Sequence, residues 1–225
     1  AISNQWITKI KESSTEAYKK IVDENISIQE YHLVSDYLDH SKVWTKSSRV
    51  LNKDFTDWFL ESDFARHIEI TYGKFFISDE NNLGWPNIYW RLVRPNKASD
   101  IGPLHRDYWF WKLNSHWCYE FLKSKKKYFR LKVWIPIYIE IGLNGLLVEP
   151  YSQNRENIKW CGEERHGIRK PLLLTPLNKL NPILLSTKEG NTVIFNDKLI
   201  HGGALNKGTK SRVSVEFTLI IEKND

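Results

Sequence analysis

The sequence predicts a mainly β domain with a helical N-terminal part, and three observations support this fold class. Apolar residues recur at helical intervals over roughly the first 66 positions, whereas beyond them the apolar pattern changes to the period of two that strands require. The later segments are rich in Val, Ile and aromatic residues and are separated by Gly, Pro or Asn. No long helices alternate with these strands, which favours a sandwich or a closed barrel over a parallel α/β sheet.

Length and composition narrow the class of protein further. The 225 residues suit one domain with a full-sized core, so we expect residues 1–225 to form a single domain. Charged residues make up 27% and apolar residues 41%, a balance that argues against disorder. The sequence shows neither a membrane span nor a signal peptide, and Cys118 and Cys161 are too few for a disulfide scaffold. We therefore expect a soluble, cytoplasmic protein with reduced thiols.

Three helices are expected in the N-terminal part. Residues 4–24 place apolar side chains at helical spacing with Lys and Glu between them. Ser27-Ile28-Gln29-Glu30 has the form of a capping box, which predicts a second helix over residues 31–38. Asp54 is expected to cap a third, short helix that carries Phe55, Trp58 and Phe59.

The rest of the chain, residues 67–225, is expected to form the β core. Two longer interruptions near 108–128 and 150–182 are expected to be loops or short helices over the mouth of the barrel, where binding residues tend to lie. The candidate strands are 68–72, 88–94, 102–107, 129–139, 146–149, 192–196 and 212–221.

Two histidine motifs suggest a metal site. In an extended strand residues i and i+2 share a face, so His105 and Asp107 can both point inward while Arg106 points away. His201 ends another apolar stretch, and the Gly202-Gly203 that follows allows the backbone to approach a ligand closely. Two imidazoles and one carboxylate bind one face of an octahedral iron and leave three adjacent positions open for chemistry.

The His-Arg-Asp motif alone is weakly specific, and other functions use similar residues. It imitates the catalytic loop of protein kinases, but Lys112 stands where a kinase has Asn, and no glycine-rich phosphate loop is present. Zinc also accepts two histidines and a carboxylate, so metal-dependent hydrolysis stays open at this point.

Arg212 and Ser214 form another i, i+2 pair on one strand face. Together they offer a guanidinium fork and a hydroxyl to a buried carboxylate. An arginine on a strand more often forms a surface ion pair. The position of Arg212, eleven residues after the glycine-flanked His201, favours a ligand-binding role instead.

Taken together, these motifs resemble the Fe(II)/2-oxoglutarate-dependent oxygenases, and within them the phytanoyl-CoA dioxygenase-like family. The resemblance covers roughly residues 85 to 220, and the ordered set of motifs is far more specific than any one of them. The matching stretches are Leu104-His105-Arg106-Asp107, residues 144–152, residues 190–195, His201-Gly202-Gly203-Ala204-Leu205-Asn206 and Arg212.

The resemblance implies a double-stranded β-helix, also called a jelly roll or cupin-like fold, with the N-terminal helices packed on one sheet. It implies Fe(II) held by His105, Asp107 and His201, with 2-oxoglutarate chelating the iron and its far carboxylate paired with Arg212 and Ser214. It further implies hydroxylation by O2 with release of succinate and CO2. Since Asp107 is present, hydroxylation is favoured over halogenation.

The chain departs from the family pattern at two positions. Gln153 stands where relatives usually have His, which puts the role of that His in doubt. Gly203 stands where relatives often have Ser two residues after the distal His, so Ser214 must replace the hydroxyl if the contact exists.

The substrate is predicted from side chains around these motifs. Tyr89 and Arg91 on one strand, and Lys132 and Trp134 on another, are candidates for lining the cosubstrate and substrate site. We expect a small or medium polar, anionic molecule, because basic residues gather in the two loops. No nucleic acid is expected, because outside the run at 123–127 the positive residues are scattered along the chain. Those basic residues are Lys123, Lys125, Lys126, Lys127, Arg155, Lys159, Arg165, Arg169 and Lys170.

Two rival functions remain at this point. One is a non-catalytic jelly-roll binding module, against which the complete set of metal ligands argues. The other is a metal-dependent hydrolase or isomerase that does not use 2-oxoglutarate, against which Arg212 argues.

Overall fold

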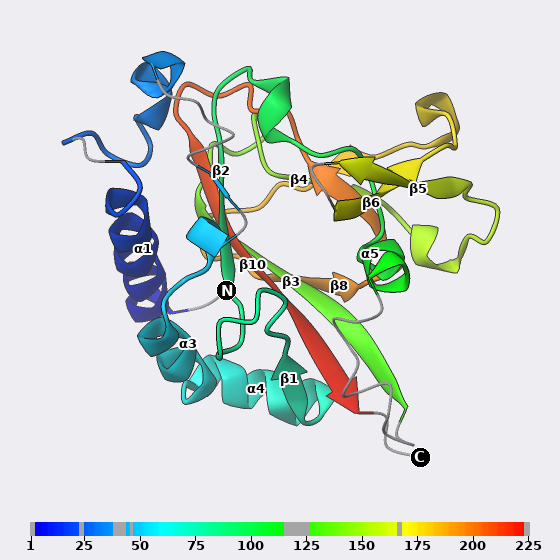
Figure 1. Cartoon of the computed structure of the whole chain (residues 1–225), viewed down its shortest axis with the longest axis horizontal. Coiled ribbons are helices and arrows are strands. Elements are labelled where there is room, and N and C mark those ends of the chain that lie inside the picture. Colours follow the sequence, from blue (N-terminus) through cyan, green and yellow to red (C-terminus); the bar gives the residue numbers. More distant parts are fainter. Residues whose placement is uncertain are drawn as a thin grey trace.

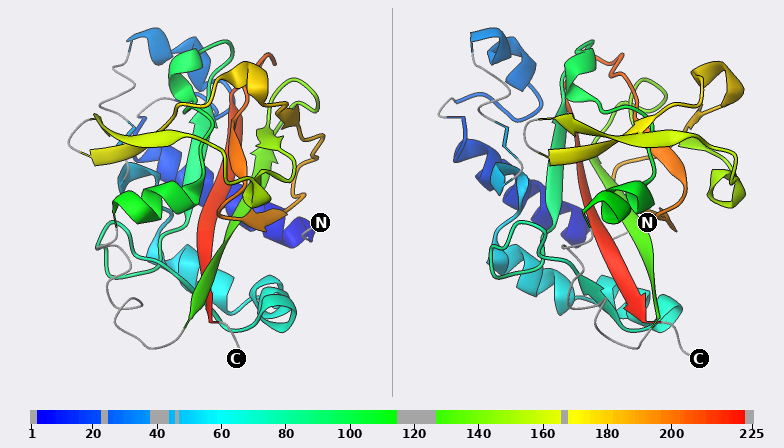
Figure 2. Two further views of the ribbon diagram at one scale, coloured as in Figure 1. Left: turned by 90° about the vertical axis from the view of Figure 1, so that its right-hand side faces the viewer. Right: turned by 45° about the vertical axis from the view of Figure 1, so that its right-hand side comes forward.

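The structure is a computed structural model, and it describes residues 3–22, 25–37, 44–45, 47–114, 127–165 and 168–222. Helices α1 (Asn4–Lys19), α3 (Lys53–Leu60) and α4 (Asp63–Tyr72) lie along one side of the long strands β3 (Tyr128–Tyr138) and β10 (Arg212–Glu222) (Figure 1). Strands β4 (Leu146–Glu149), β5 (Trp160–Arg165) and β6 (Ile168–Leu173), together with helix α5 (Asp107–Leu113), lie on the other side (Figure 2).

The strands are antiparallel and form two sheets and a hairpin. The largest sheet has the order β1-β10-β3-β8, where β1 is Phe75–Ile77 and β8 is Val193–Asn196, and β2 (Tyr89–Val93) also pairs with β10. A smaller sheet joins β7 (Ile183–Leu184), β4 and β9 (Ile200–Gly203). Strands β5 and β6 form a separate hairpin. This antiparallel architecture with helices agrees with the predicted β-rich fold class.

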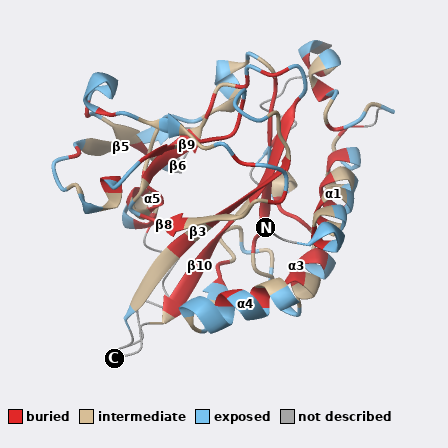
Figure 3. Cartoon of the chain, turned by 180° about the vertical axis from the view of Figure 1, so that it is seen from behind, coloured by how far each residue is buried: buried red, intermediate tan, exposed pale blue. Residues whose placement is uncertain are grey.

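Strand β10 is two-faced, which places the core on one side and polar residues on the other. Val213, Val215 and Phe217 are buried in a core that also contains Trp6 and Ile10 from α1, so helices and sheet share one core (Figure 3). Since side chains alternate along a strand, the residues between them point to the opposite face. Those residues are Arg212, Ser214, Glu216 and Thr218.

Most predicted strands of the sheet are confirmed, at 88–94, 129–139, 146–149, 192–196 and 212–221. The strand predicted at 68–72 is wrong, because these residues form the second half of α4. Ser62 caps this helix by accepting a hydrogen bond from the Ala65 N–H at 3.1 Å. The β-branched and aromatic residues there suggested a strand, but the cap and the packing of Ile68 in the core decide for a helix.

The predicted helices are confirmed in part. The first helix is α1, and the third is α3, although Asn52 rather than Asp54 caps it, through the Phe55 N–H at 2.9 Å. The prediction of a second helix is wrong for residues 31–37, because they form two short 3₁₀ turns. Residue 38 lies outside the described residues. The Ser27 hydroxyl donates to the Glu30 carboxylate at 2.7 Å, so the two side chains of the expected capping box bond to each other.

The two predicted loops differ from each other. Residues 107–113 form α5, and residues 115–126 lie outside the described residues. The second interruption contains the β5–β6 hairpin and two 3₁₀ turns, Ser152–Asn154 and Leu177–Lys179. In the part of the chain that the structure describes, no helix is long and apolar enough to cross a membrane.

Candidate metal centre

The strand predicted over 102–107 is wrong, yet its two candidate ligands still converge. His105 makes only an isolated bridge with His201 of β9, through two backbone hydrogen bonds of 2.9 Å. Asp107 is the first residue of α5. The chain thus turns from the bridge into a helix between these two ligands, and this turn directs both side chains toward His201.

His105, Asp107 and His201 form a cluster whose candidate ligand atoms all lie within 4.8 Å of one another. The Asp107 carboxylate lies between the imidazoles, with Oδ1 3.5 Å from Nε2 of His105 and Oδ2 3.7 Å from Nε2 of His201. Oδ2 is buried and has no hydrogen-bond partner among the residues that the structure describes. This spacing leaves room for a metal ion that all three side chains contact.

The other nitrogen of each imidazole supports the same conclusion. Nδ1 of His105 lies 2.9 Å from the Pro103 carbonyl, and Nδ1 of His201 lies 3.1 Å from the Leu199 carbonyl. A carbonyl can only accept, so each Nδ1 must carry the proton, which leaves Nε2 with its lone pair toward the cluster. Metal-binding histidines are held in this way, and the residues therefore fit a divalent metal such as iron.

The protonation states also suit a metal. Burial lowers the pKa of His201 to about 4, so its imidazole is neutral at physiological pH. Burial alone would raise the pKa of Asp107, but the Lys132 ammonium and the two imidazoles hold it well below its usual range. A neutral imidazole and an ionised carboxylate are the forms that bind metals.

Ser152 and Arg106 hold the two histidine segments together. The Ser152 hydroxyl accepts a hydrogen bond of 2.7 Å from the N–H of Ile200, next to His201. Arg106, next to His105, points away from the cluster as predicted and donates to the carbonyls of Ser152 and Arg155. The sequence matched residues 150–152 only as a family turn, and the structure shows that this turn positions both histidines.

The two glycines after His201 allow a close approach between protein segments. A Cβ on Gly202 would lie 3.2 Å from the Leu104 side chain, and one on Gly203 would lie 3.3 Å from that of Ile101. Strand β9 thus packs closely against the segment leading into His105, and the predicted approach to a ligand stays a prediction.

Arg212 is a buried cation on the sheet face opposite the core. Its Nη1 donates to the Ser214 hydroxyl at 3.3 Å, and its guanidinium lies 5.9 Å from the centre of the Trp134 ring. Its Nε is buried without a partner, and no carboxylate within the described ranges lies at ion-pair distance. Burial lowers its pKa to about 10, so it stays charged at physiological pH. A buried charge of this kind requires an anion.

The structure places the remaining candidates on the same face of the sheet. Arg91 pairs in register with Ser214, and Tyr89 and Trp134 pair with Glu216. Lys132 lies deepest toward the metal cluster, with Nζ 3.6 Å from Oδ2 of Asp107. The Tyr89 hydroxyl accepts a hydrogen bond of 2.9 Å from Nδ2 of Asn81. Burial raises the pKa of the Tyr89 hydroxyl.

Sequence reasoning missed Glu216, which lies among these candidates. Its Oε1 accepts from Nε of Arg91 at 2.6 Å and lies 3.9 Å from Nζ of Lys132. Burial alone would raise the pKa of this carboxyl, but the two cations bring it down to about 2. The alternation that paired Arg212 with Ser214 continues to residue 216, and that signal could have found it.

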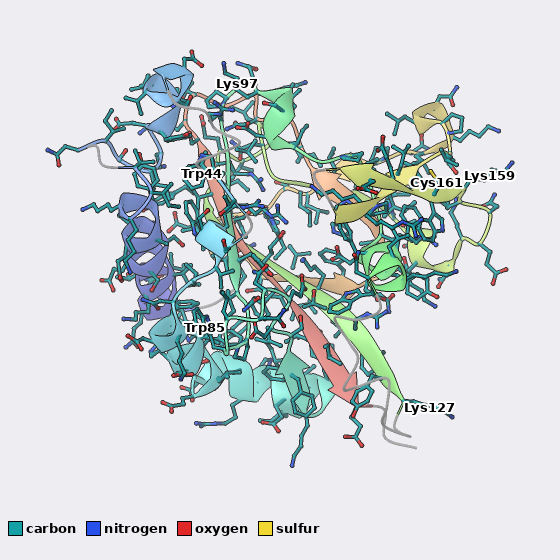
Figure 4. The ribbon with its side chains drawn as sticks, in the orientation of Figure 1. Trp44, Trp85, Lys97, Lys127, Lys159 and Cys161 are labelled. Carbon is teal, nitrogen blue, oxygen red and sulfur yellow. The ribbon has the colours of Figure 1, made fainter. Side chains whose placement is uncertain are left out.

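Three of the basic loop residues that the structure describes, Arg155, Lys127 and Lys159, form no ion pair with the metal cluster. Arg155 forms an ion pair of 2.8 Å with Glu149. Lys127 and Lys159 are exposed and lie at different ends of the molecule, at the start of β3 and beside β5 (Figure 4). Residues 123–126 lie outside the described residues.

Comparisons with known proteins establish the fold. No family model matches the chain, and no curated protein matches it in sequence. Among solved structures, it is similar to SnoK, a non-heme alpha ketoglutarate dependent carbocyclase from nogalamycin biosynthesis, with a TM-score of 0.56, 9% identity and coverage of 98% of this chain and 77% of SnoK. The chain shares the fold of SnoK.

Two further solved structures are similar to this chain in fold. EvdMO1 matches with a TM-score of 0.57 at 11% identity, over 97% of this chain and 45% of EvdMO1. AviO1 from Streptomyces viridochromogenes Tue57 matches with a TM-score of 0.50 at 11% identity, over 97% of this chain and 85% of AviO1. At such identities the likeness concerns the fold alone.

Proposed function

We propose that this protein is an Fe(II)- and 2-oxoglutarate-dependent dioxygenase that hydroxylates a small or medium polar, anionic substrate and releases succinate and CO2. One observation carries the proposal: a His105–Asp107–His201 cluster shares a domain with a buried Arg212 that has no carboxylate partner in the described chain. The cluster calls for a metal and Arg212 for an anion. The name of SnoK states dependence on alpha ketoglutarate, and its shared fold supports the same reading.

We further assign the chain to the phytanoyl-CoA dioxygenase-like enzymes, as one double-stranded β-helix domain over residues 1–225. Support comes from where the matching stretches fall. Residues 144–152 include β4 and its turn, residues 190–195 lead through β8, and residues 201–206 begin in β9. The first of these stretches contains the strand that pairs with β9 at His201, and the last begins with that ligand.

Each residue of the site has a separate role in the proposed reaction. Iron, when bound, supplies the centre at which O2 oxidises 2-oxoglutarate and then the substrate. His105, Asp107 and His201 would hold it. Arg212 binds the far carboxylate of 2-oxoglutarate, and the Ser214 hydroxyl orients the guanidinium by accepting from Nη1. Asp107 fills the ligand position that a halide would need, so the proposed reaction is hydroxylation.

Anaerobic titration of the purified protein tests the proposal. Calorimetry with Fe(II), followed by 2-oxoglutarate, should show one metal site and metal-dependent binding of 2-oxoglutarate. Admission of O2 should then yield succinate, and Asp107→Ala should lose both metal retention and succinate formation. Ser99→Ala, a change at an exposed site beside Asp100, is the matched control and should behave as the unmodified protein.

The rival functions give different results in the same experiment. A non-catalytic binding module would bind no Fe(II). A hydrolase or isomerase would bind metal, but its affinity for 2-oxoglutarate would not depend on that metal, and turnover would proceed without this cosubstrate.

A further inference from the structure

A second group of charged residues continues along the site face from Arg212. Along β10, Arg212 lies beside Gly203 of β9, with Nη2 3.8 Å from the position of a Cβ there. Arg91 pairs in register with Ser214, the next residue on this face, Glu216 follows, and Lys132 pairs with Thr218. The group Arg91, Lys132 and Glu216 therefore extends from beside Arg212 to Asp107, which lies 3.6 Å from Lys132.

The contacts in this group leave hydrogen-bond donors unused. Arg91 uses Nε for Glu216 at 2.6 Å, and its other nitrogens have no partner within the described ranges. Nζ of Lys132 lies 3.6 Å from Asp107 and 3.9 Å from Glu216, which is ion-pair distance but too long for a hydrogen bond. The Lys132 side chain is only 12% exposed, whereas that of Arg91 is 45% exposed. The group therefore runs from the metal ligand out to solvent.

Several cations surround the Glu216 carboxylate in this group. Arg91 and Lys132 both pair with Glu216, and Glu80 adds a second negative charge near Lys132. The other partner of Lys132 is Asp107, which must commit its charge to the metal. Arg49 adds a third cation close by, since the bridge between Val50 and Tyr89 brings its segment beside β2 and the Arg91 charge helps to lower its pKa. The Lys132 ammonium, which makes no hydrogen bond within the described ranges, can therefore donate to an acceptor that a ligand supplies.

We infer that Arg91 and Lys132 bind an anionic group of the substrate, a carboxylate or a phosphate, and that Glu216 orients both cations. This inference rests on the proposed function and names the class of its substrate. Anion recognition is thereby assigned to Arg91 and Lys132, whereas the sequence pattern assigned it to the basic residues of the loops. The anion would bind between the exposed Arg91 and the deeper Lys132, which directs the rest of the substrate toward the metal.

Binding of simple anions tests the inference without turnover. Protein loaded with Mn(II) and saturated with 2-oxoglutarate is titrated calorimetrically with inorganic phosphate, with benzoate and with ethylammonium. Phosphate or benzoate should bind, and ethylammonium should not. Arg91→Gln should weaken anion binding at least tenfold while the affinity for 2-oxoglutarate changes less than twofold. Arg66→Gln, which removes an exposed arginine on α4, is the matched control and should leave anion binding unaltered.

Glu216→Gln separates recognition from a merely structural role. The amide keeps an oxygen that can accept from Arg91 but removes the negative charge. Anion binding should therefore tighten several-fold, whereas a structural defect would weaken it. The inference is overturned if Arg91→Gln binds anions as well as the unmodified protein, if it loses 2-oxoglutarate instead, or if ethylammonium binds in a manner that depends on Glu216. Anion binding through Arg91 in a protein that takes up no metal would contradict the proposed function while the anion site stands.

Discussion

A buried guanidinium without a carboxylate partner is costly to keep, and among the described residues Arg212 has none at ion-pair distance. The interactions that hold it, with the Ser214 hydroxyl and the Trp134 ring, supply no negative charge. An incoming carboxylate therefore gains a nearly desolvated ion pair with two parallel hydrogen bonds. A substitution of Arg212 should therefore weaken the binding of 2-oxoglutarate and leave the binding of the metal unchanged.

Arg212→Ala should raise the dissociation constant of 2-oxoglutarate more than tenfold, because a desolvated charge pair contributes roughly 2–5 kcal/mol. Arg212→Lys should recover only part of the loss, since it keeps the charge without the bidentate fork. Anaerobic calorimetry measures both ligands, and the affinity for Fe(II) should stay the same. Unaltered 2-oxoglutarate binding by Arg212→Ala would remove Arg212 from the site.

His201 should make the metal-free protein sensitive to mild acid. Its folded pKa of about 4 lies below the unfolded value of about 6.5, so between these values only the unfolded chain binds the proton. The free energy of unfolding should therefore fall as the pH falls through this window, by about 2 kcal/mol between pH 7 and pH 5. Urea denaturation with a chelator present measures it.

The contribution of His201 can be isolated by substitution. His201→Gln should lose that part of the pH dependence, whereas His67→Gln, an exposed change on α4, should retain it. Equal pH dependence in all three proteins would contradict the neutral, buried state of His201.

Residue spacing could predict His105, Asp107, His201 and Arg212, because each lies at a fixed offset in a motif. It could not predict Ser152 as the residue that positions both histidines, since the hydrogen bond to Ile200 joins segments 48 residues apart. Glu216 was missed for a simpler reason: a glutamate on a strand is ordinarily exposed, and only the neighbouring Arg91 and Lys132 explain its burial.

At the scale of elements, the turn after β4 is expected to set the positions of the metal ligands. Ser152→Ala removes a buried acceptor and leaves the Ile200 N–H without a partner, which should cost about 1–3 kcal/mol of stability. Metal retention should fall with it, because Ile200 adjoins His201. Thermal denaturation and metal analysis measure the two effects, and Ser99→Ala should change neither.

Gly208, in the loop between β9 and β10, leaves no room for a side chain. A Cβ on Gly208 would lie 2.1 Å from Oε1 of Glu140. That carboxylate accepts from the N–H groups of Thr209 and Lys210 and cannot move away freely. Gly208→Ala should therefore destabilise the protein by about 1–3 kcal/mol and weaken 2-oxoglutarate binding, since this loop leads into Arg212. Gly102→Ala, where a Cβ meets nothing within 4 Å, is the control and should be nearly neutral in denaturant titrations.

Elements were predictable where pattern and packing agree. Strands β3 and β10 were found because apolar residues recur at every second position on the core side. The segment before Asp107 was misjudged, since the two ligands of a His-x-Asp motif can converge through a turn into a helix as well as along a strand. Helix α4 and the β5–β6 hairpin were missed because short segments carry too little periodic signal.

At the scale of the whole molecule, a bound metal should stabilise the fold. His105 and Asp107 precede α5 or begin it, whereas His201 belongs to β9, so an ion would connect segments almost a hundred residues apart in sequence. Mn(II) at a hundred times its dissociation constant should add about 2.7 kcal/mol, or roughly 5–10 °C in Tm. Scanning calorimetry measures the shift, and Asp107→Ala should show none. An equal shift in that variant would indicate metal binding elsewhere.

Strand β10 lies at the centre of its sheet, although β1, β2, β3 and β8 all precede it in the sequence. At synthesis rates of about 5–20 residues per second, these strands leave the ribosome seconds before their common partner. During that interval their unpaired edges can pair with other nascent chains. Arg212 lies at the start of the same late strand. A nascent chain therefore acquires its proposed cosubstrate-binding residue only as its sheet closes.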